Sequence, residues 1–153
     1  MNSKMKVAFV GSSGGHLNHL LKVKKAFDEY ESFWVTFDKI DANSALAGEK
    51  VYHAFFPTNR NLTNLVKNFW LAIKVLVAEK PDVIISSGAA VAVPFFYVGK
   101  ILGAKLIYVE VIDRIDSPTL TGKLVYPITN LFLVQWETML QVYPKARYIG
   151  RLY

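Results

Sequence analysis

Short apolar runs rich in β-branched and aromatic residues alternate along this 153-residue chain with longer segments of helical periodicity. The runs predict strands at 6–10, 33–37, 51–55, 83–86, 106–110, 131–134 and 148–149. The segments between them predict helices at 17–30, 62–79, 91–102 and 120–127. This alternation is typical of a parallel sheet with helices on both faces, so we expect an α/β, Rossmann-like fold. No repeat or linker interrupts the pattern, and we expect residues 1–153 to form a single domain.

The composition of the chain limits the kinds of molecule that it is expected to bind. Hydrophobic residues make up 52% of the chain, and this excess must lie in a core, a partner interface or a membrane surface. The net charge of +6 favours anionic partners, but the cations are scattered and form no arginine-rich run, which disfavours nucleic acid. The chain has no cysteine and no cluster with metal-ligand spacing, so we expect no metal site. The lack of cysteine also fits a reducing cytoplasm. No signal peptide or run of about 20 apolar residues is visible, so we expect a chain that can lie on a membrane but does not cross one.

The turn between the first predicted strand and helix carries the strongest indication of a binding site. It consists of Gly11, Ser12, Ser13, Gly14, Gly15 and His16. Backbone N–H groups at such a helix start point outward and bind anions, so we expect the turn to hold a phosphate-bearing ligand. The alternative is a tight turn needed only for packing. His16 could accept a proton near neutral pH, or it could be a helix-capping or solvent-facing residue.

A dinucleotide-binding lobe is a second interpretation of the same turn. Ser13 and His16 stand where the fingerprint G-x-G-x-x-G requires glycine, so the match is poor. Asp38, after the second predicted strand, nevertheless stands where a ribose-binding acid would lie. A nucleotide-binding oxidoreductase therefore stays open as an alternative.

Two further loops follow predicted strands and should meet the glycine turn at the carboxyl edge of the sheet. Ser87 and Gly88 could donate N–H groups to a sugar or phosphate, or could simply allow a helix to pack closely on the sheet. Glu110 ends the strand 106–110 and is a candidate sugar-hydroxyl acceptor or general base.

Polar residues continue after Glu110. Arg114 could bind a phosphate, or could pair with the neighbouring Asp113 or Asp116 on the surface. Thr121 and Lys123 are further candidates for binding the acceptor or its phosphate, although Lys123 could be an ordinary helix-surface lysine. The cluster as a whole favours a site.

The predicted helix around 62–77 is apolar around most of its circumference, unlike an ordinary surface helix. Phe69 and Trp70 could enter a lipid headgroup layer, with Lys67 and Lys74 near the anionic surface. A helix buried in the core or in a subunit interface is the alternative.

Several motifs together resemble the Alg14 family, whose bacterial members are the PssD and CpsF-type proteins of exopolysaccharide and capsule synthesis. They are the turn 11–16, residues 85–89 with Val93-Pro94, residues 107–110 with Arg114, and the segments 120–124, 134–137 and 143–146. The resemblance implies one lobe, the N-terminal half, of a GT-B glycosyltransferase of the MurG type. It also implies that a separate Alg13-like polypeptide binds most of the nucleotide-sugar donor, and that this chain carries no cofactor of its own.

By the same resemblance, this chain binds a lipid-diphosphate-linked saccharide at the cytoplasmic face of the cell membrane. The diphosphate would lie against the turn 11–15 with help from Arg114, and His16 or Glu110 would accept a proton from the acceptor sugar. Eukaryotic members carry an N-terminal membrane helix that is not visible here, so the helix 62–77 is the expected peripheral anchor. A non-catalytic scaffold for the Alg13-like partner is the other reading.

Overall fold

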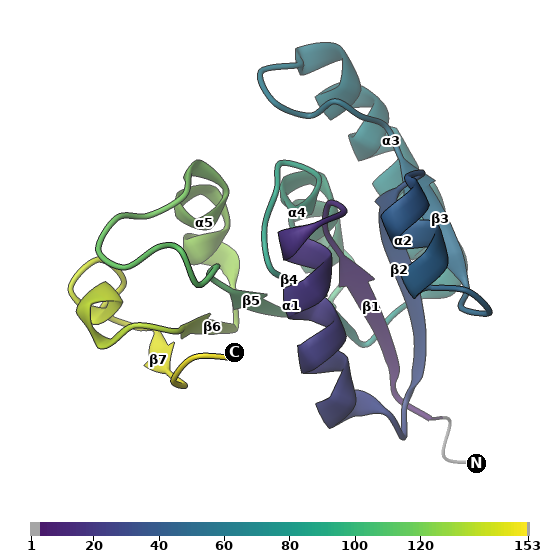
Figure 1. The fold of residues 1–153 in the computed structure, drawn as a ribbon. Coiled ribbons are helices and arrows are strands. Elements are labelled where there is room, and N and C mark those ends of the chain that lie inside the picture. The colour runs from purple at the N-terminus through teal and green to yellow at the C-terminus, as the bar shows by residue number, and fades with distance from the viewer. Residues whose placement is uncertain (1–3, 153) are drawn as a thin grey trace.

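The structure is a computed structural model that describes residues 4–152, and a seven-stranded parallel sheet forms its centre (Figure 1). The strands are β1 (Lys6–Val10), β2 (Glu31–Phe37), β3 (Val51–Ala54), β4 (Val83–Ser86), β5 (Lys105–Val109), β6 (Leu131–Val134) and β7 (Arg147–Tyr148). Their spatial order is β3-β2-β1-β4-β5-β6-β7, and every neighbouring pair is parallel. The chain order reverses between β1 and β4, and ligands of open α/β sheets bind at such a switch point.

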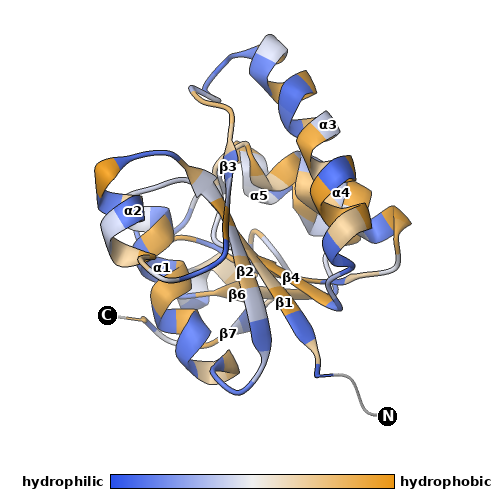
Figure 2. Ribbon diagram, turned by 90° about the vertical axis from the view of Figure 1, so that its right-hand side faces the viewer, coloured by the Kyte–Doolittle hydropathy of each residue, from blue (hydrophilic) through white to orange (hydrophobic). Residues whose placement is uncertain are grey.

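Helices cover both faces of the sheet, as predicted (Figure 2). One face carries α1 (Gly15–Lys24) and α2 (Ile40–Ala45), and the other carries α3 (Leu62–Glu79), α4 (Ala92–Ile101) and α5 (Leu120–Val125). Short 3-10 turns follow at η1 (Lys25–Phe27), η2 (Tyr126–Ile128) and η3 (Glu137–Leu140). The predicted α/β, Rossmann-like fold is therefore confirmed.

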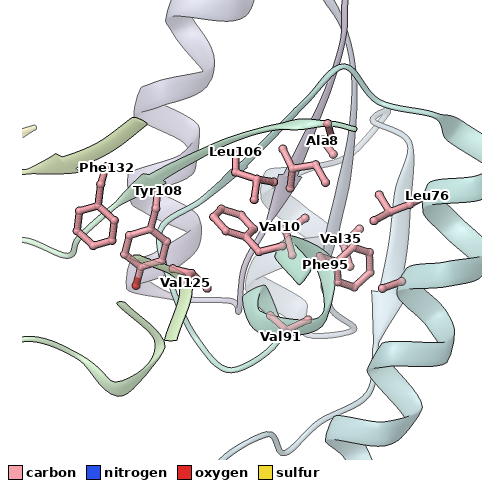
Figure 3. Packing of buried hydrophobic residues seen from close by; sticks show 14 of the residues in the cluster. Ala8, Val10, Val35, Leu76, Val91, Phe95, Leu106, Tyr108, Val125 and Phe132 are labelled. Atoms are coloured by element: carbon pink, nitrogen blue, oxygen red, sulfur yellow. The ribbon is translucent and has the colours of Figure 1, made fainter. Parts of the chain in front are cut away.

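Alternating side chains of the strands feed two separate cores, because successive residues of a strand point to opposite faces. Ala8 and Val10 of β1 join the cluster beneath α3, α4 and α5 (Figure 3), whereas Val7 and Phe9 join the cluster beneath α1. A Cβ at Gly99 of α4 would overlap the side chain of Ile84 in β4, so glycine lets this helix lie close to the sheet.

Some predicted bounds differ from the structure for identifiable reasons. The first helix begins at Gly15 and changes to a 3-10 turn after Lys24, so the predicted helix 17–30 is too long at its end. The last predicted helix ends as η2, where Pro127 lacks the N–H that an α-helix needs. The helices α2 and η3 were not predicted because they are too short to show a periodic pattern.

A buried carboxylate fastens the end of α3 to the sheet. Glu79 is 7% exposed, and its oxygens accept hydrogen bonds from Tyr52 at 2.5 Å and from Lys6 at 3.2 Å and contact Lys50. Burial alone would raise the pKa of Glu79, but the hydrogen bonds from Lys50, Tyr52 and Lys6 outweigh it and lower the pKa to about 2.

The substitution Glu79→Gln should lower the free energy of unfolding by about 1–3 kcal/mol at neutral pH, because it removes the charge from a buried acceptor that three donors share. The carboxylate of the folded wild type has a depressed pKa, so its stabilisation is present above pH 4.5 and is lost as the pH falls toward 2. Urea unfolding between pH 7 and pH 2 should therefore show a smaller loss of stability in the variant than in the wild type. Glu49→Gln, at an exposed position, is the control, and equal acid sensitivity in all three proteins would contradict the assignment.

Candidate functional site

A pocket of about 300 Å³ opens at the carboxyl edge of the sheet, beside the start of α1. Its walls come from the first two turns of α1 and from the loop 111–119, which follows β5 and which we call the β5 loop. The lining residues are Gly15, His16, His19, Val111, Asp113, Arg114 and Thr119. This is the place where a doubly wound sheet binds ligands, and three of the predicted site residues lie here.

His16 is held in one tautomer by the loop that follows β4. Its ring Nδ1 lies 2.9 Å from the carbonyl oxygen of Ser87, and the Ser87 hydroxyl donates in return to the carbonyl of His16 at 2.7 Å. A carbonyl can only accept, so Nδ1 carries the proton and Nε2 keeps its lone pair. Burial lowers the pKa of His16 below its usual 6.5, and the Ser87 bond and the Asp113 charge only partly oppose this. The ring is therefore a neutral base at pH 7.

Ser87 and Gly88, which were predicted either to bind the acceptor or to allow close packing, contact His16 and do not line the pocket. Both are buried, and the N–H of Gly88 is already bonded to the Ser86 hydroxyl at 3.1 Å. Gly88 has a φ of +123°, and a Cβ there would lie 2.8 Å from Cε1 of His16. This loop needs glycine because the imidazole occupies the space of a side chain.

The glycine turn is only partly available to a ligand. Gly11 donates its N–H to the carbonyl of Val35 at 3.0 Å, and Gly14 donates its N–H to the Asp41 carboxylate at 2.9 Å. Asp41 belongs to α2, a helix that the sequence pattern did not reveal. Of the five turn residues predicted to bind phosphate, Gly15 alone lines the pocket, whereas Gly11, Ser12, Ser13 and Gly14 do not.

Glu110 lies behind the pocket wall, at 1% exposure, and so is not placed as the general base that the sequence suggested. Its carboxylate accepts hydrogen bonds from the Thr119 hydroxyl at 3.1 Å, from the Thr119 N–H at 3.3 Å and from the Val111 N–H at 3.2 Å. Burial raises the pKa of Glu110, and these bonds oppose the rise. A Cβ at Gly122 would lie 2.5 Å from Oε2 of Glu110. Glu110 thus positions Thr119, which does line the pocket.

Of the remaining residues predicted to bind the acceptor or its phosphate, one lines the pocket and two do not. Arg114 is half-buried and lines the pocket, and among residues 4–152 it forms no ion pair with Asp113 or Asp116. Thr121 and Lys123 lie on α5 outside the pocket lining, because the helix turns them away after Thr119. Within the same range no three His, Asp or Glu side chains are grouped to hold a metal ion.

Asp38, the residue behind the oxidoreductase alternative, is exposed beyond the end of β2 and accepts a hydrogen bond from the Asn43 amide at 2.8 Å. It lines a shallow surface with α2 instead of the pocket that holds His16.

Sequence reasoning did not assign to the site three residues that shape it, although two of them lie in the segment 134–137 that carries the family resemblance. His19 is buried on α1 and bridges to the β5 loop, and Gln135 and Trp136 hold the same region from the end of β6. The Gln135 amide donates to the carbonyl of Glu110 at 3.0 Å, and the Trp136 ring N–H donates to the carbonyl of Ile112 at 2.5 Å. A histidine three residues after His16, on the same helix face, was the available signal for His19.

Exposed apolar side chains form a surface on the α3, α4 and α5 side of the sheet. The exposed stripe on α3 recurs every three or four residues and comprises Leu62, Val66, Trp70, Ile73 and Val77. Tyr97 and Ile101 of α4 and Leu120 and Leu124 of α5 extend it. Lys67 and Lys74, which were predicted to lie near an anionic membrane surface, are exposed on the same helix. Phe69 was expected to share this surface but is half-buried, because its side chain turns toward the packed face of α3. No helix within residues 4–152 is long and apolar enough to cross a membrane.

Solved structures share this fold at low sequence identity. MurG from Acinetobacter baumannii superimposes with a TM-score of 0.73 at 16% identity, over 88% of this chain and 42% of its own. A glycosyltransferase from Rickettsia africae gives 0.71 at 15% identity, over 98% of this chain and 44% of its own. A UDP-N-acetylglucosamine 2-epimerase from Rickettsia bellii gives 0.73 at 13% identity, so the fold by itself does not select the reaction. The chain spans less than half of each of these proteins and matches one lobe of a GT-B glycosyltransferase.

Curated relatives are similar over nearly the whole chain. The human UDP-N-acetylglucosamine transferase subunit ALG14 is 24% identical over 97% of this chain and 83% of its own length. The corresponding subunit of Schizosaccharomyces pombe is 30% identical over 94% of this chain and 81% of its own length. The family model described as "Oligosaccharide biosynthesis protein Alg14 like" matches residues 7–152. With this match and relatives that align along almost all of its length, the chain belongs to the Alg14 family.

Proposed function

We propose that this chain is the acceptor-binding subunit of a two-polypeptide, inverting glycosyltransferase that extends a lipid-diphosphate-linked saccharide. The observation that carries the proposal is a neutral His16, with Nε2 unprotonated, in a pocket that also contains Arg114. Relatives of this chain are named as subunits of a UDP-N-acetylglucosamine transferase, and MurG is more than twice as long as the matched region. Both facts support a second polypeptide, Alg13-like, that holds most of the nucleotide-sugar.

In the proposed reaction, a hydroxyl oxygen of the acceptor sugar attacks the anomeric carbon of the donor, which the partner holds. The bond from that carbon to the nucleotide diphosphate breaks, and the nucleotide leaves with the electron pair. The hydroxyl proton passes to Nε2 of His16, and the Ser87 carbonyl stabilises the imidazolium through the bond to Nδ1. Attack from the face opposite the leaving group inverts the anomeric carbon.

The acceptor diphosphate would be held by charge and by backbone dipoles. The Arg114 guanidinium can form two parallel hydrogen bonds to a phosphate, and Gly15 at the start of α1 adds the positive end of the helix dipole. Because the N–H of Gly14 is bonded to Asp41, the proposal puts the diphosphate on the Gly15 side of the turn. Thr119, held by Glu110, can contact the acceptor sugar from the opposite wall.

The apolar surface on α3, α4 and α5 suits peripheral binding to the cytoplasmic face of the cell membrane. An apolar stripe containing Trp70 and bordered by Lys67 and Lys74 matches an anionic bilayer surface. The surface continues to Leu120, which directly follows Thr119 of the pocket wall. A lipid-linked acceptor could therefore enter the pocket while its lipid stays in the bilayer.

The motif resemblance to PssD and CpsF-type proteins leads us to infer capsule or exopolysaccharide synthesis as the pathway. The names of the relatives make UDP-N-acetylglucosamine the first donor to test. The proposal includes no metal and no cofactor bound by this chain alone.

Replacing His16 tests the assignment of the base. His16→Ala should lower sugar transfer by the reconstituted pair by about 10²–10⁴-fold, because general-base catalysis is lost. Binding of a polyprenyl-diphosphate saccharide should change far less. His53→Ala, at an exposed position on β3, is the matched control. Full activity of His16→Ala would instead indicate a scaffold that only localises a partner already able to catalyse.

The pH dependence offers a second test of the same group. Because only neutral His16 can accept the proton, kcat/KM should fall as the pH decreases through a pKa below 6.5. The Asp113 carboxylate raises the pKa of His16, so Asp113→Asn should move this acidic limb to lower pH. An unchanged or upward shift of the limb in a pH–rate profile would remove His16 from this role.

The membrane contact can be measured without a partner. Trp70→Ser combined with Val66→Ser should release the chain from anionic vesicles in co-sedimentation, because both side chains are exposed on the stripe. Tyr148→Ser, which removes an exposed aromatic ring from β7, should leave binding unchanged. A wild-type chain that never sediments with phosphatidylglycerol vesicles would refute the interfacial surface.

A further inference from the structure

His19 bridges the two walls of the pocket. It lies one helical turn after His16 on α1 and is 4% exposed. Its Nδ1 is 2.8 Å from the carbonyl oxygen of Gly15, and its Nε2 accepts the N–H of Ile112 in the β5 loop at 3.3 Å. A carbonyl cannot donate and a backbone amide cannot accept, so both bonds form only when the ring is neutral with its proton on Nδ1.

Ile112, whose N–H donates to His19, lies in the turn of the β5 loop that leads to Arg114. The N–H of Arg114 bonds back to the carbonyl of Val111 at 3.1 Å, so Ile112 lies inside the turn that presents Arg114. Trp136 and Thr138 hold the same loop from the other side, through the carbonyls of Ile112 and Ile115. The β5 loop is therefore held on one side by bonds to its carbonyls from residues in and next to η3, and on the other side by the bond from the Ile112 N–H to α1.

We propose that His19 is a positioning residue that sets the separation between His16 on α1 and Arg114 on the β5 loop. This inference rests on the proposed function, in which His16 takes the proton and Arg114 holds the acceptor diphosphate. Loss of the bridge leaves the partly buried Ile112 amide without its acceptor and frees the turn that carries Arg114. His16 keeps its own bonds to Ser87. The acceptor KM should therefore rise about tenfold, the effect of losing roughly one hydrogen bond, while kcat changes little.

Two amide substitutions separate the two ring nitrogens. His19→Gln places an acceptor near the position of Nε2 and can still bond Ile112. His19→Asn places a donor near the position of Nδ1, keeps the bond to Gly15 and cannot reach Ile112. The pair differs by one methylene, so a general loss of packing predicts similar damage in both.

Hydrogen exchange of the Ile112 amide, followed by NMR on the isolated chain, is the primary measurement. Protection of this amide should fall about tenfold or more in His19→Asn and stay near the wild-type value in His19→Gln. The acceptor KM of the reconstituted pair should follow the same order. Equal protection of Ile112 in all three proteins would overturn the proposal, as would an unchanged KM in His19→Asn.

A measurement on the unmodified chain guards against variants that do not fold. The ring ¹⁵N shifts of His19 should report a proton on Nδ1 and a bonded lone pair on Nε2, with scalar coupling from Nε2 to the Ile112 nitrogen. The opposite tautomer would refute the bridge. These NMR measurements need no acceptor and no partner, so they test the His19–Ile112 hydrogen bond by itself. Failure of the reconstituted pair to transfer sugar would refute the proposed function and would leave the NMR result on this hydrogen bond unaffected.

Discussion

The hydrogen bond between Nδ1 of His16 and the carbonyl of Ser87 joins the start of α1, which follows β1, to the loop that leaves β4, at the switch point of the sheet. It fixes the imidazole tautomer, and the reciprocal bond from the Ser87 hydroxyl ties the backbone of α1 to the same loop. Gly88 has no side chain because the ring fills that space. The contact between His16 and Ser87 thus explains why glycine is needed at position 88 and how the candidate base is oriented. The proposed chemistry depends on this contact.

The opposite wall of the pocket is built on a buried carboxylate. The Glu110 carboxylate accepts hydrogen bonds from the Thr119 hydroxyl and the Val111 N–H, and its backbone carbonyl accepts one from the Gln135 amide. An unpaired carboxylate at this depth would be costly, so its hydrogen bonds keep the β5 loop in one arrangement. The same loop leads into α5, whose first residue, Leu120, belongs to the apolar surface. The candidate catalytic pocket and the candidate membrane surface therefore share one structural element.

Much of the fold could be predicted from the sequence, because burial makes apolar residues recur at the spacing of a strand or a helix. The strands are apolar runs, and all seven predicted strands exist within two residues of their expected bounds. The long helix 62–79 is correct to the residue, since Asn61 caps its start and Pro81 follows its end. The helix α2 was missed because six residues with a single buried alanine, Ala42, show no amphipathic pattern.

The sequence by itself determined the fold class, the family and the edge of the sheet where the site lies, because strand ends and glycine turns are local signals. It also selected His16 and Arg114, which the structure brings to one pocket. Only the tertiary structure decided that Glu110 faces inward, that Asp41 occupies the N–H of Gly14 and that His19 spans to Ile112. These depend on contacts between residues far apart in the chain, and a residue's type does not reveal which distant backbone group will fill its hydrogen bonds.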